Sequence, residues 1–161
     1  MRFGFSLLIF FSYLNVSAQQ YGFINYSVED GLAQSQINSI AQDNKGYLWF
    51  ATNGGISRFD GRTFVNYYIG DGLLDNHVYS IFIDRNEKIW LATLGGINMI
   101  DGKKISFFKF EDSYKGFYVK SIAQDLQGNL WLGTSGGGLA FFDVEKKEFK
   151  YYGTEDLSLI H

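Results

Sequence analysis

The sequence lacks cysteine and proline altogether, and it contains only two histidines among its 161 residues. Without cysteine no disulfide can hold the fold, so packing alone must stabilise it. The absence of proline, together with many aromatic residues, favours strands over helices or disorder. Basic residues form no stripe and the formal net charge is −3, which argues against nucleic acid as a partner. His77 is the only internal histidine and has no ligand partners at suitable spacing, so no metal or other cofactor is expected.

Tryptophan is rare but regularly spaced. The three tryptophans, Trp49, Trp90 and Trp131, are separated by 41 residues in both intervals. Each lies in a run of an apolar residue, tryptophan, an apolar residue, a small residue and threonine, with a pair of glycines shortly after. Such a run predicts a short strand that ends in a tight turn. A repeat of this period indicates an array of one supersecondary unit.

The repeat extends on both sides of each tryptophan and predicts four strands per unit. The first strand ends in an aspartate, at residues 37–43, 78–84 and 119–125. The tryptophan strand is second, the third covers 55–60, 96–101 and 139–143, and the fourth covers 64–67, 105–108 and 149–152. An aspartate that opens a turn can accept hydrogen bonds from the N–H groups after it. We therefore expect Asp43, Asp84 and Asp125 to fix the hairpins that follow them.

Four short strands in about 41 residues are typical of a β-propeller blade. The sequence therefore predicts an all-β fold of four-stranded antiparallel blades, with repeats at 37–68, 78–109 and 119–152. Each blade covers one face of its neighbour, and we expect tryptophan and outer-strand aromatics to fill the seams between blades. A β-helix or solenoid would need a shorter period per coil, and a sandwich would not repeat residue by residue.

The segment before the first blade is similar to an outer strand. Residues 23–26 match residues 64–67, again 41 residues away, so we expect a fourth strand with no blade in front of it. Three blades are fewer than the four to eight of a closed ring. We therefore expect residues 19–161 to be a partial propeller with an incomplete ring, completed by the remaining blades of a longer chain. Completion of the ring by separate chains, as a homo-oligomer, is the alternative.

The first residues have the pattern of an export signal. Arg2 supplies positive charge, residues 3–14 are mainly apolar, and small residues at 16–18 suit a signal peptidase. The apolar run is too short to span a bilayer comfortably, which favours a cleaved signal over an anchor. We expect residues 1–18 to be a signal peptide and the mature chain to be periplasmic or otherwise extracytoplasmic.

The consensus of the three copies resembles the two-component regulator propeller repeat. It reads Gly-Leu, then Val/Ile-x-Ser-Ile-x-x-Asp-x-x-Gly-x-Leu-Trp-x-x-Thr-x-x-Gly-Gly. The resemblance implies the N-terminal sensor region of a hybrid two-component protein or related histidine kinase, of the type found in gut Bacteroidetes. It also implies perception of carbohydrate breakdown products or other extracytoplasmic signals. In such proteins a β-sandwich, a membrane helix and a cytoplasmic kinase follow, so kinase activity is not implied for these residues.

Residues that recur in every copy are poor candidates for a catalytic site. The three aspartates lie at one equivalent turn of successive blades, which separates them instead of bringing them together. The recurring serines Ser39, Ser80 and Ser121 have no paired histidine and aspartate, which argues against a nucleophilic triad. The glycine pairs open no helix, so they indicate turns and not phosphate loops. We therefore expect no enzymatic activity from this chain.

Positions that differ between copies are better candidates, because packing does not dictate them. The connection from the outer strand to the next inner strand varies, and so do the residues that enter the inner strand. In propellers these positions usually line one face and the mouth of the central channel. The predicted ligand-binding residues are Gln36, Asn38, His77, Tyr79, Tyr118 and Lys120. The alternative is that they belong to solvated loops without a binding role.

The sequence favours a ligand-sensing or interaction module that responds to a small molecule or oligosaccharide. An extracytoplasmic propeller enzyme, similar to streptogramin lyases or glycosidases, is a second hypothesis. It would need several histidine, glutamate or arginine side chains that converge on one face, and the visible blades offer only His77. A structural scaffold for protein partners is the third.

Overall fold

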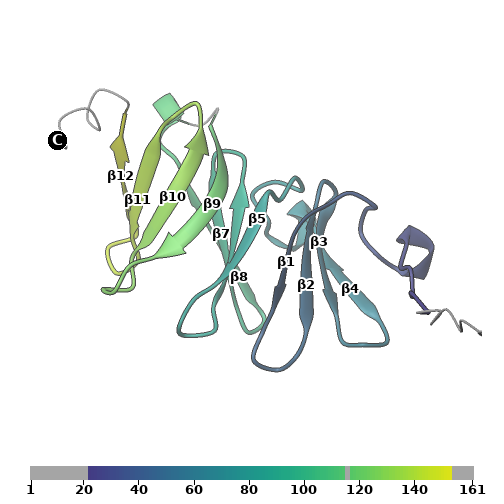
Figure 1. Ribbon diagram of the computed structural model, residues 1–161. Coiled ribbons are helices and arrows are strands. Elements are labelled where there is room, and N and C mark those ends of the chain that lie inside the picture. The colour runs from purple at the N-terminus through teal and green to yellow at the C-terminus, as the bar shows by residue number, and fades with distance from the viewer. Residues whose placement is uncertain (1–21, 115–116, 154–161) are drawn as a thin grey trace, which may run out of the picture.

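The computed structural model describes residues 22–114 and 117–153, and its regular structure there is almost entirely strand (Figure 1). Twelve strands in these ranges form three separate four-stranded sheets, and every neighbouring pair is antiparallel. The prediction of an all-β, blade-type fold is confirmed. The signal peptide predicted for residues 1–18 lies outside the described residues.

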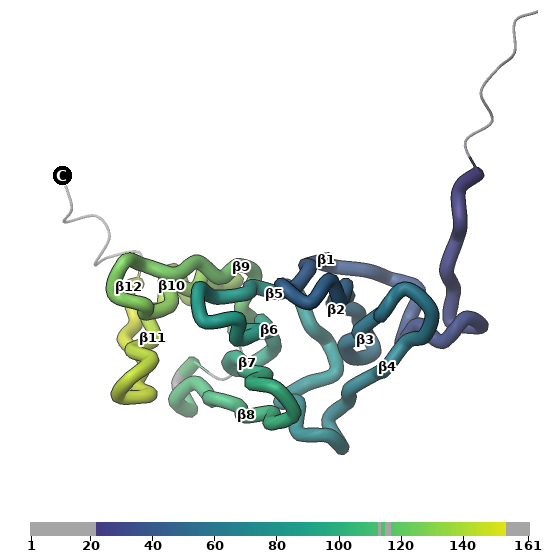
Figure 2. Tube along the Cα trace, turned by 90° about the horizontal axis from the view of Figure 1, so that it is seen from below, coloured from purple at the N-terminus to yellow at the C-terminus, as the bar shows by residue number. Residues whose placement is uncertain are grey.

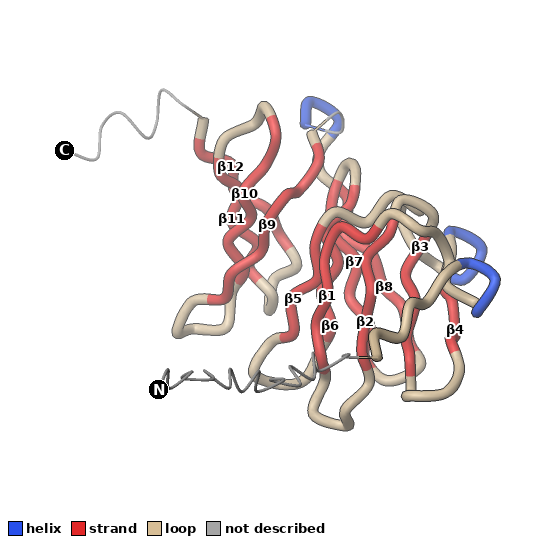
Figure 3. Tube along the Cα trace, turned by 45° about the vertical axis from the view of Figure 1, so that its right-hand side comes forward, coloured by secondary structure: helices blue, strands red, loops and turns tan. Residues whose placement is uncertain are grey.

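Each sheet is built from strands that are consecutive in the sequence. The first contains β1 (Ile37–Gln42), β2 (Leu48–Thr52), β3 (Gly55–Phe59) and β4 (Phe64–Tyr67). The second contains β5 (Ser80–Ile83), β6 (Ile89–Thr93), β7 (Gly96–Asp101) and β8 (Lys104–Lys109). The third contains β9 (Tyr118–Gln124), β10 (Leu130–Ser135), β11 (Leu139–Asp143) and β12 (Glu148–Tyr152). Short 3₁₀ turns precede the sheets, namely η1 (Val28–Asp30), η2 (Ile69–Asp71) and η3 (Asp112–Tyr114) (Figure 3).

The three sheets follow one another along an arc and do not close on themselves (Figure 2). The first strand of each sheet lies on the same side of the arc, and β5 contacts both β1 and β9. The later strands of each sheet fan away from this inner edge. The arrangement is that of neighbouring propeller blades, with β1, β5 and β9 as the inner strands.

An aspartate and a tryptophan are hydrogen-bonded to each other in every sheet. In the second sheet, Asp84 Oδ2 accepts a 2.8 Å bond from the Trp90 indole N–H. Its Oδ1 accepts backbone bonds from Asn86 (2.8 Å) and Lys88 (3.0 Å). The same three bonds recur at Asp43 with Trp49 and at Asp125 with Trp131. The predicted hairpin role of these aspartates is confirmed, and the structure adds the bond to the indole.

The tryptophans of the first two sheets fill the seams between blades, as predicted. Trp49 belongs to an apolar cluster with residues of the second sheet, among them Ile89 and Leu91. Trp90 is fully buried against Leu130 and Leu132 of the third sheet. Burial of one indole removes on the order of 200 Å² from water, which corresponds to roughly 5 kcal/mol before entropy is considered. These clusters make adjacent blades pack as one body.

The connection that precedes each of the first two sheets is bound to the third or fourth strand of that sheet. Asn98 of β7 accepts a bond from the Leu74 N–H and donates one to the Gly72 carbonyl. In the first sheet Ser57 accepts from the Ala33 N–H, and Asn66 donates to the Gly31 carbonyl. The short side chains on β3, β4 and β7 therefore hold the incoming chain against the sheet it is about to enter.

Residues 23–26, expected to be an outer strand with no blade in front of it, have no strand to pair with in the described part of the chain. The segment makes no ladder with another described strand, and the side chains of Phe23 and Ile24 are 94% and 77% exposed. A strand needs a partner for its backbone groups, and the first sheet already has β4 as its outer strand. Only Tyr26 packs on that sheet, with its ring centroid 4.9 Å from that of Phe59.

Replacement of Asp84 by alanine should strongly destabilise the fold. The buried Trp90 N–H and two backbone N–H groups would lose their acceptor, and each unsatisfied buried donor costs about 1–3 kcal/mol. We expect the free energy of unfolding, measured with urea and circular dichroism, to fall by about 3 kcal/mol or more. The matched control is Asp101→Ala, which removes an exposed carboxylate 3.7 Å from Lys88 and should cost less than about 1 kcal/mol. Equal losses in the two variants would contradict this role of Asp84.

Candidate ligand-binding surface at the inner strands

The predicted site residues lie where the chain enters the three inner strands. Asn38 is in β1, Tyr79 directly precedes β5, and Tyr118 and Lys120 are in β9. Backbone bonds hold this edge in place: the N–H of Val78 donates to Thr52 of the first sheet, and the N–H of Tyr79 donates to Ala92 of its own sheet. The entry to β5 is therefore fixed between two blades.

Three of the predicted residues form a continuous stack of rings, which we term the aromatic stack: His77, Tyr79 and Tyr118. The ring centroids of His77 and Tyr79 are 4.2 Å apart, and those of Tyr79 and Tyr118 are 4.6 Å apart, each with an interplanar angle of 20°. The Lys120 ammonium lies 5.4 Å from the centroid of the Tyr118 ring. The stack thus joins the second blade to the third, and its rings are only partly buried.

Asn38 brings the first blade to the same edge. Its side-chain amide donates to the Val78 carbonyl at 2.8 Å and to Asn53 Oδ1 at 2.7 Å. Val78 lies between the two stacked residues of the second blade, so Asn38 supports the backbone that carries them. Gln36 is exposed, and its backbone N–H donates to the Gln34 side chain. No contact of Gln36 with the stack occurs among the described residues, so the structure does not bring it into the group.

Electrostatics at the stack favour a neutral phenol at Tyr79. Burial raises the pKa of Tyr79, and the nearby Tyr118 and Asp75 raise it further because they disfavour a second negative charge. Asp75 also accepts a 2.7 Å bond from the His77 backbone N–H, which orients the start of the stack. The stack can therefore offer ring faces, a neutral hydroxyl and a lysine ammonium to a ligand.

Sequence reasoning missed Asn53 and Asp75, which hold this surface in shape. The turn after the tryptophan strand differs between copies, with Asn53, Leu94 and Ser135 at equivalent positions. The rule that positions differing between copies are candidates for a site could therefore have identified this turn. In the second blade this turn reaches the third, because Leu94 pairs with Tyr118 and the Gly95 N–H donates to the Phe117 carbonyl.

Other kinds of site find little support in the part of the chain that the structure describes. Residues 22–114 and 117–153 contain no group of three or more histidine, cysteine, aspartate or glutamate side chains placed to hold a metal. Within the same ranges no helix has the length and apolar character needed to cross a membrane. Ser39, one of the recurring serines, accepts a 3.3 Å bond from the Ile81 N–H and thereby joins β1 to β5.

Sequence comparisons relate this chain to a two-component regulator family and to a histidine kinase. The profile of the family described as "two component regulator propeller" matches residues 31–54 and 72–95. A histidine kinase, P4, from Formosa agariphila is 41% identical over 64 residues, which represent 37% of this chain and 5% of the kinase.

Similar solved structures agree with this relationship. The extracellular domain of BT3049, described as a hybrid two component system of B. thetaiotaomicron, has a TM-score of 0.75 and 25% identity over 86% of this chain and 21% of that one. Virginiamycin B lyase from Staphylococcus aureus has a TM-score of 0.61 over 73% of this chain and 41% of the lyase. At 17% identity the lyase shows a shared fold alone.

This chain spans only a small part of the proteins that it matches, 5% of the kinase and 21% of the BT3049 domain. The two matched segments run from the glycine-leucine pair before each inner strand to the turn after the tryptophan strand, and they include both aspartate–tryptophan pairs. Residues 31–54 and 72–95 therefore match the two-component regulator propeller model, within an array of propeller-type blades.

Proposed function

We propose that this chain is an extracytoplasmic ligand-sensing module of a two-component sensor, and that the aromatic stack binds its ligand. The observation that carries the proposal is the stack itself: His77, Tyr79 and Tyr118 come from two blades and meet at the inner edge. Ligand sites commonly combine aromatic side chains with a few placed polar groups. The similarity to extracellular domains of two-component systems supports the sensory role and the location outside the cytoplasm.

The ligand that best suits this surface is an oligosaccharide or a small molecule of similar character. A sugar presents a flat C–H face that can pack on a ring and hydroxyl groups around its rim. The Tyr79 hydroxyl is a neutral donor and acceptor, Asn38 adds an amide oxygen, and Lys120 adds a cation beside Tyr118. In a longer sensor, further blades would pack on the outer faces of the first and third sheets. Nucleic acid is not a proposed partner.

Binding is favoured over catalysis at this surface. A histidine that acts as a general base is typically oriented by a third group, often a carboxylate bonded to its ring nitrogen. His77 instead packs its ring on Tyr79, and Asp75 accepts a bond from the His77 backbone and not from its ring. We therefore propose no enzymatic activity. Recovery of unchanged oligosaccharide after incubation with the chain, analysed by mass spectrometry, checks this part of the proposal, and cleaved or eliminated product would contradict it.

Loss of the tyrosines should abolish binding. The test is a titration of the whole chain with a panel of neutral oligosaccharides by isothermal calorimetry, followed by the double variant Tyr79→Ala/Tyr118→Ala with the best binder. We expect at least about a tenfold loss of affinity, because each ring contributes about 0.5–1.5 kcal/mol beyond the area it buries. Phe107→Ala is the control, since this ring is 50% exposed on the outer strand β8 and should not matter. Equal affinity in wild type and the double variant would refute the site.

The acid–base behaviour of Tyr79 should report an intact stack. Its pKa is raised in the folded chain, so folding favours the protonated phenol. The corresponding stability is complete below the unfolded pKa of about 10 and is lost as the pH rises through the folded value. An NMR titration of the tyrosine Cζ resonances, assigned with Tyr79→Phe, should place the Tyr79 midpoint above about 10. In Asp75→Asn, which removes one source of negative charge, the midpoint should fall. A midpoint at or below about 10 in wild type would contradict the described geometry.

A further inference from the structure

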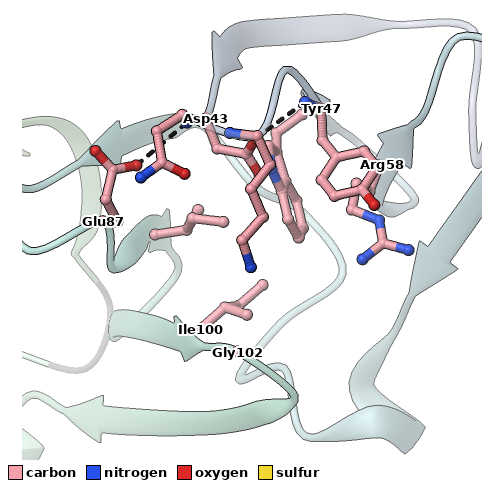
Figure 4. A pocket seen from close by; sticks show the side chains of 10 residues that line it. Asp43, Tyr47, Arg58, Glu87, Ile100 and Gly102 are labelled. Carbon is pink, nitrogen blue, oxygen red and sulfur yellow. Dashed lines mark hydrogen bonds between the residues drawn. The ribbon is translucent and has the colours of Figure 1, made fainter.

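A pocket of about 140 Å³ lies between the first and second blades, at the end of β1 opposite the aromatic stack (Figure 4). The turn after β1 supplies one wall through Asp43 and Tyr47, and β3 supplies Arg58. The second blade closes the other side with Glu87 and Ile100. The pocket is therefore independent of the ligand-binding surface described above.

Arg58 occupies a position where the other blades have apolar residues. It is the ladder partner of Trp49, and the corresponding partners of Trp90 and Trp131 are Met99 and Phe141. An apolar side chain suits this position, because it packs beside the tryptophan. A guanidinium is costly there unless its N–H groups find acceptors. Only the first of the three blades has an arginine at this position, and blade packing does not explain it. The arginine therefore indicates a local requirement of the first blade.

The Arg58 guanidinium lies over an aromatic ring, and its Nε has no hydrogen-bond partner among the described residues. Its central carbon lies 4.6 Å from the centroid of the Tyr47 ring and 5.9 Å from that of Trp49. Such stacking uses the face of the planar group and leaves the in-plane donors for an acceptor. Nε of Arg58 is buried and has no hydrogen-bond partner among the described residues. Figure 4 shows this group beside Tyr47, across the pocket from Glu87.

The carboxylates that line the pocket are already occupied. Both oxygens of Asp43 accept bonds, from the backbone N–H groups of Lys45 and Tyr47 and from the Trp49 indole. Glu87 accepts a 3.2 Å bond from the Asn44 N–H. Across residues 22–114 and 117–153, neither Lys45 nor Arg58 lies within ion-pair distance of a carboxylate. The pocket thus has two cations without an ion-pair partner, Lys45 and Arg58, beside two carboxylates that already accept hydrogen bonds.

We propose that this pocket binds an oxyanion, either a free carboxylate or sulfate or the acidic group of a larger ligand. Arg58 would donate in its own plane through its two terminal nitrogens, a bidentate arrangement that suits both groups. Lys45 would add a second positive charge. The size of the pocket admits one acidic group and not a chain of sugar rings, so this site is distinct in chemistry from the aromatic stack.

The test uses acetate and sulfate as probes and acetamide as the neutral counterpart of acetate, with the ionic strength kept constant by chloride. The signals followed are the Arg58 Nε–H and the Tyr47 and Gly102 backbone amides in ¹H–¹⁵N spectra. We expect saturable shifts with one or both anions and none with acetamide. In Arg58→Met, which copies Met99 of the second blade, the Tyr47 and Gly102 shifts should be lost, with affinity reduced at least about tenfold.

Arg62→Met serves as the control, because it removes an exposed arginine from the nearby β3–β4 turn and should leave binding unchanged. If Arg58→Met fails to fold, Arg58→Lys keeps the charge without the bidentate fork and should bind more weakly than wild type. Anion shifts that are the same in wild type and in a folded Arg58 variant would overturn the proposal. Absence of saturable shifts with both anions up to about 50 mM, far above the Kd of a millimolar site, would overturn it as well.

Discussion

The fold depends on the hydrogen bond between an aspartate at the end of the inner strand and the indole N–H of the next strand. Trp90 is completely buried, so its polar N–H would be costly without an acceptor. Asp84 supplies that acceptor and with its second oxygen fixes the turn between the two strands. One carboxylate therefore closes the hairpin and sets the orientation of the ring that fills the seam. Because the same bonds occur in all three sheets, the blades share one shape and stack in one way.

This constraint separates the residues that build the array from those that are free to bind. The aspartate and the tryptophan are the same in each blade, and most positions at the seams are apolar. The entries to the inner strands differ between blades, and there His77, Tyr79 and Tyr118 meet across two blades. Arg58 is a second departure from the common pattern, at a position that faces a seam. Both candidate sites thus lie at positions where the blades differ. They are carried by a framework of residues that the blades share.

Much of the fold could be predicted from the sequence, because the period of 41 residues aligns the strands of each copy. The bounds of β7 (Gly96–Asp101) and β11 (Leu139–Asp143) agree with the prediction residue for residue. Errors occur where neighbouring parts of the chain decide the structure. β5 begins at Ser80 and not at residue 78, because the Val78 N–H donates to Thr52 of the preceding sheet.

The candidate site could be predicted as a set of positions but not as an arrangement. Variation between copies identified Tyr79 and Tyr118, whereas their stacking depends on how closely β5 approaches β9. The role of Asn53 and the unpaired Nε of Arg58 are likewise contacts between elements, which no local pattern encodes.

A double-mutant cycle of Asp84→Ala and Trp90→Phe, followed by urea unfolding, tests the central interaction most directly. If the carboxylate–indole bond couples the turn to the seam, the effects of the two substitutions on the free energy of unfolding should be non-additive by about 1–3 kcal/mol. Additivity within about 0.5 kcal/mol would show that the aspartate and the tryptophan stabilise the blade independently, and would contradict this account.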